Sequence, residues 1–304
     1  MSEIKIPSYW EELAEDVHQL KGVVMVVGAS DTGKTTLAIY LAGELLKRRN
    51  RVSIVSADMG QCAFGPPAAI SMAIPELIPE FPKNLPVHSM YFVGSTSPVD
   101  HLLQTVVGVK KLVDRSLQAG AEVVIVDTTG FVSGGAAWEL KFHKIELTDA
   151  GCIVALQRGR ELEDILIPHE RRTGRRLYRL PVSEDTKVRS YEQRREYRRQ
   201  RYQDYFRGAK DKSLPLSDIR LINPYDKALQ GGESDAFKRL LVGLNDDENF
   251  STALGVIEDI DLTKGTIRLI TPLEALSKVR LIRLGSIKIE EDWGDSNVGP
   301  LHTA

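Results

Sequence analysis

An eight-residue stretch, GASDTGKT, occupies Gly28–Thr35 and fits the pattern G-x-x-x-x-G-K-[ST] at every position. It lies between an apolar run typical of a buried strand and a segment with helical patterning, which is the context in which this pattern binds phosphates. Glycines let such a loop close around phosphate groups with its N–H groups directed inward, and the start of the following helix adds partial positive charge. The sequence therefore predicts a nucleoside triphosphate site, although the pattern alone identifies no reaction.

The predicted loop assigns a role to each polar side chain. Lys34 can bridge the β- and γ-phosphates, and Thr35 can bind Mg²⁺. A chance glycine turn is the alternative, and the strand, the spacing and the helix found together argue against it. The residues expected to hold the nucleotide are Gly28, Ala29, Ser30, Asp31, Thr32, Gly33, Lys34, Thr35 and Thr36.

Two carboxylates stand at the ends of predicted strands. Asp58 closes the strand at Arg51–Asp58, and Asp127 closes the strand at Ala121–Asp127. Ligands of open parallel sheets lie outside the carboxyl ends of the strands, so both should lie near the triphosphate. One can deprotonate an attacking group and the other can hold Mg²⁺, directly or through water. Spacing does not assign these roles, so Asp58 and Asp127 both join Thr35 as candidate metal ligands, and a solvated loop acid remains the alternative for each.

The segment after the first of these acids, DMGQCAFGPPAAIS at Asp58–Ser71, combines two glycines with two adjacent prolines. Such residues impose an unusual backbone path, which favours a substrate-binding loop over a simple connector. Gln61 in this loop offers a neutral donor and acceptor that can orient a hydroxyl or a phosphate.

Positive charge is concentrated in one segment, RSYEQRREYRRQRYQDYF at Arg189–Phe206. If it is helical, Arg194, Arg198 and Arg201 share one face. Over residues 171–208, thirteen Arg and Lys stand against five Asp and Glu, and twelve of the thirteen are arginine. Since arginine grips phosphate in bidentate fashion, this pattern favours a phosphate-handling element over a solvated, self-paired helix.

The rest of the composition excludes several classes. Lys and Arg number 40 against 42 Asp and Glu, so a nucleic-acid site must be local. The two cysteines are far apart, which argues against a disulfide framework, and the six histidines show no zinc spacing. The N-terminus lacks the apolar core of a signal peptide, and no run of about 18 apolar residues predicts a membrane span. We therefore expect a soluble cytoplasmic protein.

Strands alternating with helices predict an α/β fold, a P-loop NTPase with a parallel sheet covered by helices on both faces. We expect an N-terminal helical segment at 1–21, a P-loop kinase domain at 22–213 with an arginine-rich lid at about 170–208, and a small β-rich C-terminal domain at 214–304. The predicted helices are 8–20, 34–49, 98–120 and 135–148, with a short helical stretch at 159–166, and the predicted strands are 22–28, 51–58, 87–94, 121–127 and 151–156.

Taken together, these features resemble the polynucleotide 5′-hydroxyl-kinase family, which includes the kinase subunit of the mRNA cleavage and polyadenylation machinery, the nucleolar kinase of pre-rRNA processing, and archaeal and bacterial relatives. The resemblance runs from about Gly22 to Ile289. DMGQ at Asp58–Gln61 matches the family's D-x-G-Q, and TTGF at Thr128–Phe131 is similar to its T-x-G-W. The arginine segment is similar to the family's lid, and the β-rich tail to its C-terminal domain.

The resemblance implies transfer of the γ-phosphate of ATP, with Mg²⁺, to the 5′-OH of RNA or DNA. In this reading the catalytic residues are Asp58 as general base, with Lys34, Arg194 and Arg198. Substrate contacts would come from Gln61, Thr128, Phe131, Arg189 and Arg195. Gln157 and Arg158 correspond to the family's nucleotide-base loop.

The chain departs from the family in two places. Phe131 replaces the tryptophan of T-x-G-W, with less ring area to stack on a terminal base. Residues 1–21 stand where the eukaryotic cleavage-factor subunit has a domain of its own, so Tyr9 or Trp10 is a candidate for stacking on adenine, and equally for a core or surface aromatic.

Two other functions remain open: a non-catalytic ATP-binding scaffold in an RNA-processing complex, and a small-molecule P-loop kinase. A GTPase is disfavoured because QRGRELE follows the strand after which an N-K-x-D guanine reader would stand. The sequence leaves protein partners unknown and does not separate RNA from DNA.

Overall fold

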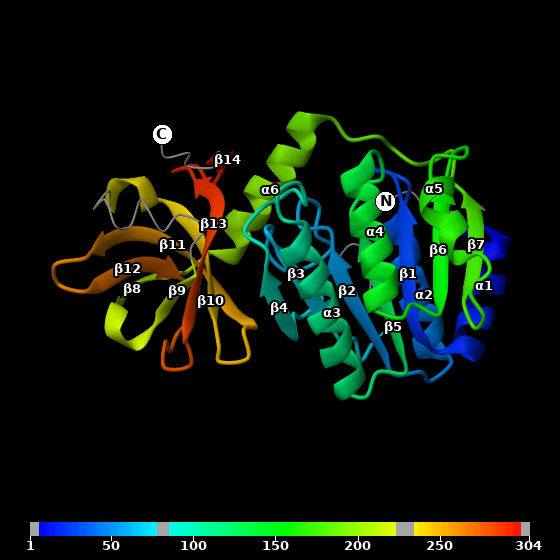
Figure 1. Ribbon diagram of the computed structural model, residues 1–304, viewed down its shortest axis with the longest axis horizontal. Coiled ribbons are helices and arrows are strands. Elements are labelled where there is room, and N and C mark those ends of the chain that lie inside the picture. The colour runs from blue at the N-terminus through cyan, green and yellow to red at the C-terminus, as the bar shows by residue number, and fades with distance from the viewer. Residues whose placement is uncertain (1–5, 78–84, 223–233, 299–304) are drawn as a thin grey trace.

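The structure, a computed structural model, describes residues 6–77, 85–222 and 234–298. Figure 1 shows an α/β body and a β-rich body side by side, with helix α6 (Tyr191–Tyr205) between them. In the described ranges, no helix combines the length and apolar character needed to cross a membrane.

The α/β body is built on a seven-stranded sheet with the order β4-β3-β2-β5-β1-β6-β7. Strand β1 pairs in parallel with β5 and β6, so the strand that leads into the P-loop has neighbours on both sides. The strands are β1 (Gly22–Gly28), β2 (Val52–Ala57), β3 (Ala69–Ala73), β4 (Ser89–Phe92), β5 (Val123–Thr128), β6 (Cys152–Gln157) and β7 (Arg176–Pro181).

One strand departs from the parallel sheet that the sequence predicts. Strand β3 runs antiparallel to both β2 and β4. It begins inside the predicted loop Asp58–Ser71, where the paired prolines and the glycines conceal the short strand that follows them. The chain therefore turns back beside β2 after Asp58, and does not cross over through a helix.

Helices cover both faces of this sheet, as predicted, and their apolar sides explain why the central strands are apolar throughout. Helices α1 and α2 share one buried core with the sheet, and α3, α4 and α5 share the other. The bounds are α1 (Ser8–Leu20), α2 (Lys34–Lys47), α3 (Leu102–Gln118), α4 (Gly135–Leu147) and α5 (Glu163–Leu166), the last followed by a 3-10 turn at Ile167–His169.

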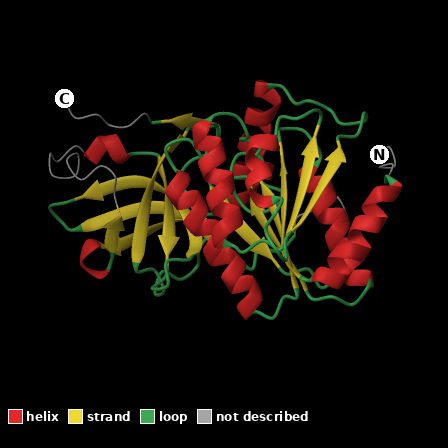
Figure 2. Cartoon of the chain, turned by 45° about the vertical axis from the view of Figure 1, so that its right-hand side comes forward, coloured by secondary structure: helices red, strands yellow, loops and turns green. Residues whose placement is uncertain are grey.

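The β-rich body is a second seven-stranded sheet with the order β14-β13-β10-β11-β12-β8, to which β9 adds beside β13. Figure 2 shows its strands grouped at the left of the molecule, on the side away from the N-terminus. Its first strand begins at Lys210, ahead of the predicted boundary between residues 213 and 214. The strands are β8 (Lys210–Pro215), β9 (Arg220–Ile222), β10 (Leu240–Asn245), β11 (Ser251–Asp261), β12 (Thr266–Thr271), β13 (Leu281–Ile289) and β14 (Asp295–Asn297), with 3-10 turns at Leu216–Asp218 and Ser234–Phe237.

The segment predicted as a lid, about residues 170–208, divides into three parts. It begins with strand β7 at the sheet edge, continues as a connection that passes over the upper ends of the strands in Figure 1, and ends in α6. The helix starts at a capping box: Ser190 accepts a hydrogen bond from the Gln193 backbone N–H, and the Gln193 side chain accepts one from the Ser190 N–H.

The two bodies are joined by a buried core of their own, made by residues of β4, α6 and the second sheet. The ring of Phe92 lies against two glycines of that sheet. A Cβ atom at Gly243 would lie 2.6 Å from Phe92 Cβ, and one at Gly285 would lie 2.9 Å from the tip of the ring. Tyr202, in the C-terminal half of α6, and Phe206, which follows the helix, are buried in the same core. This half of the lid helix is therefore anchored between the domains.

This interface predicts that Phe92→Ala destabilises the protein by about 3–5 kcal/mol, because the removed ring leaves a cavity that the surrounding glycines cannot fill. Equilibrium unfolding in urea measures the change. Leu103→Ala is the matched control, since Leu103 is 73% exposed and its truncation should change the free energy of unfolding by less than about 0.5 kcal/mol. Equal effects of the two substitutions would contradict the interface.

Candidate active site

The P-loop connects β1 to α2 at the carboxyl edge of the sheet. Gly33 has φ +87° and Asp31 has φ +55°, so the loop passes twice through the left-handed region. Lys34 is buried and its Nζ donates to the Ala29 carbonyl at 2.6 Å, across the loop. Burial lowers the pKa of Lys34, while the carboxylates of Asp127 and Asp58 act in the opposite direction.

A hydrogen bond links the P-loop to the neighbouring strand. Thr35 Oγ1 donates to Asp127 Oδ2 at 2.6 Å, and Asp127 is 1% exposed. The other carboxylate oxygen, Oδ1, is buried without a hydrogen-bond partner in the described part of the chain. Burial raises the pKa of Asp127 to about 6. A hydroxyl beside a buried carboxylate with an unused oxygen is a donor set that fits Mg²⁺.

The turn after β5 packs directly on the P-loop. A Cβ atom at Gly130 would lie 2.3 Å from Ser30 Oγ and 2.6 Å from the Ser30 backbone, so only glycine permits this approach. Lys141 on α4 holds the turn from below, because its Nζ donates to Thr128 Oγ1 at 2.8 Å and to the Thr129 carbonyl at 2.6 Å. This turn therefore fixes the P-loop and the end of β5 relative to each other.

Lys141 and the nearby Lys144 are site residues that the sequence analysis missed. Both are fully buried, and Lys144 Nζ is buried without a hydrogen-bond partner among the described residues. Burial lowers the pKa of Lys144 to about 8, against the opposing influence of Asp58 and Asp127. Their positions in the helix could have revealed them. Together with Ala137 they occupy the stripe of α4 that packs on the sheet, where apolar residues are expected.

Asp58 follows the carboxyl end of β2 and lines a cavity that it shares with the P-loop. Its Oδ1 accepts hydrogen bonds from the backbone N–H groups of Gly60, at 3.0 Å, and Gln61, at 2.9 Å. These bonds hold one carboxylate oxygen in place within the turn and fix the orientation of the group. The turn also requires glycine at position 60, where a Cβ atom would lie 2.6 Å from the Thr96 carbonyl oxygen.

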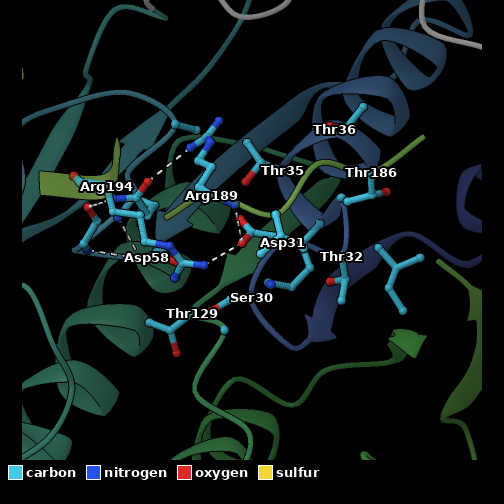
Figure 3. Close-up of a pocket in the computed structure, with 18 of the residues that line it drawn as sticks. Ser30, Asp31, Thr32, Thr35, Thr36, Asp58, Thr129, Thr186, Arg189 and Arg194 are labelled. Carbon is cyan, nitrogen blue, oxygen red and sulfur yellow. Dashed lines mark hydrogen bonds and ion pairs between the residues drawn. The ribbon is translucent and has the colours of Figure 1, made fainter. Parts of the chain in front are cut away.

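Lid residues reach across to the P-loop, as Figure 3 shows. Arg194 Nη2 contacts Asp31 Oδ2 at 2.5 Å, and the Arg189 backbone N–H donates to the same oxygen at 3.1 Å. The Arg189 guanidinium donates to Gln61 Oε1 at 3.1 Å. The lid thus lies over the loops that follow β1 and β2.

Further along α6, three contacts hold the helix to its surroundings. Arg198 Nε donates to Asp295 Oδ2 at 2.9 Å, and both side chains are largely buried. The Tyr197 hydroxyl donates to the Cys62 carbonyl at 2.7 Å, and Arg201 donates to the Gly65 carbonyl at 2.6 Å. The helix is therefore bonded to the C-terminal domain on one side and to the loop after Asp58 on the other.

These elements enclose a cavity of about 1380 Å³. The predicted site residues that line it are Ser30, Asp31, Thr32, Gly33, Lys34, Thr35, Thr36, Asp58, Gln61, Phe131, Arg189, Arg194 and Arg198.

Seven predicted residues do not line the cavity: Gly28 and Ala29 of the P-loop, the buried Asp127 at the end of β5, and Gln157, Arg158, Thr128 and Arg195. Gln157 donates to Glu163, and Arg158 donates to the Asp31 carbonyl, so neither lines the cavity from the loop after β6. Thr128 is buried beneath the site and donates to the Val26 carbonyl. Arg195 is exposed on the side of α6 away from the cavity lining.

Comparisons with known proteins identify the family and the fold to which the chain is similar. The model of the family described as mRNA cleavage and polyadenylation factor CLP1 P-loop matches residues 28–208. A polyribonucleotide 5′-hydroxyl-kinase of Methanocaldococcus jannaschii is 32% identical over 88% of this chain and 87% of its own length. One of Pyrococcus abyssi is 33% identical over 88% of each. The solved structure of a wild-type Clp1p–Pcf11p complex aligns with TM-score 0.67 and 15% identity over 92% of this chain and 79% of that one, which shows the same fold.

The buried Lys144 predicts a pH-dependent stability. Its folded-state pKa, about 8, lies below the unfolded value of 10.5, so burying the charged ammonium costs stability at pH 7. That cost falls as the pH rises from about 8 to 10.5, because the folded state releases the proton first. Lys144→Met should therefore raise the free energy of unfolding at pH 7 by up to about 3 kcal/mol and remove the rise in this window.

Urea unfolding at pH 7, 8.5 and 10 measures both effects. The control is Lys47→Met, since Lys47 lies exposed on α2 and its replacement should change little at any of these pH values. A loss of stability in Lys144→Met at pH 7 would show that the ammonium is stabilising.

Proposed function

The chain belongs to the mRNA cleavage and polyadenylation factor CLP1 P-loop family, and from this premise we propose that it is a polynucleotide 5′-hydroxyl kinase that transfers the γ-phosphate of ATP to the 5′-OH end of RNA or DNA. The observation that carries the proposal is the convergence of three elements on one cavity. The P-loop, the fixed carboxylate of Asp58 and the arginines of α6 all line it.

The cavity supplies positive charge for the triphosphate from two directions. Lys34 approaches from the P-loop, and Arg194 approaches from the lid. Phosphoryl transfer passes through a loose transition state, which needs positioning and compensating charge more than covalent assistance from the protein. Arg194 is paired with Asp31, and we propose that the triphosphate takes the place of this carboxylate as its anionic partner.

Asp58 is the proposed general base. The two backbone N–H groups that bind its Oδ1 orient the carboxylate, and it lies on the cavity wall. A carboxylate in this state can take the proton of a 5′-hydroxyl as that oxygen attacks. Thr35 and Asp127 would hold Mg²⁺, which when bound neutralises part of the phosphate charge.

The substrate strand is proposed to enter on the side of Asp58. Gln61 and Phe131 line this side, and Phe131 offers a ring on which the terminal base can stack. The relatives are named as polyribonucleotide kinases, which makes RNA the first substrate to test. Cys62 and Cys152 are both free and buried, which fits the reducing cytoplasm that we propose as its compartment.

A non-catalytic ATP-binding scaffold and a small-molecule kinase are the alternatives. Lys34, Thr35 and Asp58 are all present on the wall of one cavity, which favours catalysis over a scaffold.

The test is transfer of label from γ-labelled ATP to matched RNA and DNA oligonucleotides with 5′-OH ends, single- and double-stranded, with nucleosides as competitors. Label on the oligonucleotides supports the proposal. If ATP stays bound through purification but is not turned over, the result supports the scaffold. If nucleosides compete at lower concentrations than oligonucleotides do, the result supports a small-molecule kinase.

The general-base role predicts that Asp58→Asn lowers kcat by about 10²–10⁴-fold and leaves the affinity for ATP nearly unchanged. Asparagine keeps an oxygen that can accept from Gly60 and Gln61, so the turn should persist. Single-turnover kinetics and ATP titration measure the two effects. If ATP binding is lost while the residual rate is normal at saturation, Asp58 holds metal or nucleotide and is not the base.

The lid prediction compares two arginines of one helix. Arg194→Ala should lower kcat on the order of 10²-fold, because a cation aimed at the transferring phosphate is removed. Arg199→Ala is the control, since Arg199 pairs with Glu196 on the same helix and does not line the cavity. Initial rates at saturating ATP measure both variants. Equal rates of Arg194→Ala and Arg199→Ala would mean that α6 has only a structural role.

A further inference from the structure

The turn after β5 lies between the P-loop and the proposed base. The order of the first sheet places β5 between β1, which leads into the P-loop, and β2, which leads to Asp58, and all three strands are parallel. Thr129, Gly130 and Phe131 of this turn line the cavity. A phosphoryl group that moves from the P-loop toward Asp58 therefore passes over the end of β5.

Lys141 holds the peptide bond between Thr129 and Gly130. This lysine is fully buried, and its Nζ donates to the Thr129 carbonyl at 2.6 Å. The same Nζ donates to Thr128 Oγ1 at 2.8 Å, and that hydroxyl donates to the Val26 carbonyl of β1 at 2.8 Å. The ammonium is thereby fixed relative to β1 and β5, and it sets the direction of the Thr129 carbonyl.

The direction of this carbonyl decides the direction of the next N–H group. In a planar trans peptide the C=O and the N–H point in opposite directions, so the Gly130 N–H points away from the buried Lys141. Among the described residues, no acceptor takes a hydrogen bond from this N–H. Gly130 also lies against the Ser30 backbone of the P-loop. Its N–H is therefore a donor available to a ligand beside the phosphate loop.

A fixed N–H at this place suits the chemistry of phosphoryl transfer. The oxygens of the transferring group carry negative charge throughout the reaction, and a donor that is already oriented stabilises that charge without reorganising. Burying an ammonium costs free energy that an apolar side chain at position 141 would not. An apolar side chain, however, would leave the Thr129 carbonyl without the donor that orients it.

We propose that Lys141 is a positioning residue of the kinase, which orients the Thr129–Gly130 peptide so that the Gly130 N–H donates to an oxygen of the transferring γ-phosphate. The inference rests on the nucleotide site of the proposed function. Lys141 itself does not touch the nucleotide, because it is fully buried and does not line the cavity. Its effect therefore depends on the γ-phosphate, and ADP, which lacks this group, should bind equally well without the ammonium.

Lys141→Met tests the role, because it removes the donor and keeps a long unbranched side chain. It should lower kcat about 10²-fold, as expected for the loss of one oriented donor, and raise the Kd for the non-hydrolysable β,γ-imido analogue of ATP about tenfold. The Kd for ADP should stay the same. Single-turnover kinetics and calorimetry measure these quantities, on protein that urea unfolding shows to be folded.

Ile145→Val is the matched control. Ile145 is buried on the same helix, and its apolar side chain cannot bond to the turn. Its truncation should leave the ratio of the two Kd values unchanged. Equal losses of affinity for the analogue and for ADP in Lys141→Met, or an unchanged kcat, would overturn the proposal and leave the ammonium with a structural role.

The wild-type protein offers a second test that does not depend on the folding of a variant. Labelling threonine at the carbonyl carbon and glycine at nitrogen selects, by NMR, the N–H groups of the three Thr–Gly pairs in the sequence, which are Thr32–Gly33, Thr129–Gly130 and Thr173–Gly174. Gly33 should respond to both nucleotides, Gly174 to neither, and Gly130 to the analogue alone. If no signal responds to the analogue alone while calorimetry shows both nucleotides bound, the proposal is overturned.

The outcomes separate this inference from the kinase proposal. Label transfer at the same rate by wild type and Lys141→Met overturns the role of Lys141 and leaves the kinase standing. A loss of affinity in Lys141→Met for the analogue alone, with no label on any 5′-OH end, overturns the kinase and supports the orientation of Gly130. Failure of the wild-type protein to bind either nucleotide overturns both.

Discussion

The hydrogen bond from Thr35 to Asp127 is the contact around which the site is organised. It joins the loop after β1 to the end of β5, and it places a hydroxyl beside a buried carboxylate that keeps one oxygen unused. The glycine contact between Gly130 and Ser30 closes the same junction from above, and Lys141 holds it from below. Because both strands are central in the sheet, neither side of the junction can shift without disturbing the core.

Acidic and basic side chains lie close together at this junction. Burial raises the pKa of Asp127 and lowers the pKa values of the neighbouring Lys34, Lys141 and Lys144. A low-dielectric edge of this kind strengthens every interaction with an incoming triphosphate. The lid arginines complete the arrangement from the solvent side.

The β-rich C-terminal region contributes contacts to the site although it lies outside the first sheet. Its glycine-lined surface takes the ring of Phe92, its core buries Tyr202 of α6, and its Asp295 pairs with Arg198. The lid helix is thereby held at its C-terminal half, while its N-terminal half projects over the P-loop. This explains how a chain that is nearly neutral overall can present a fixed row of guanidinium groups at one place.

The sequence by itself determined the phosphate loop, the alternation of strands and helices, and the arginine-rich helix, because short-range spacing and periodicity encode each of them. Four features depend on the tertiary structure. They are the antiparallel β3, the hydrogen bond from Gln157 to Glu163, the ion pair of Arg198 with Asp295, and the buried lysines of α4. Each of these depends on contacts between segments distant in the chain, and a local pattern does not specify such contacts.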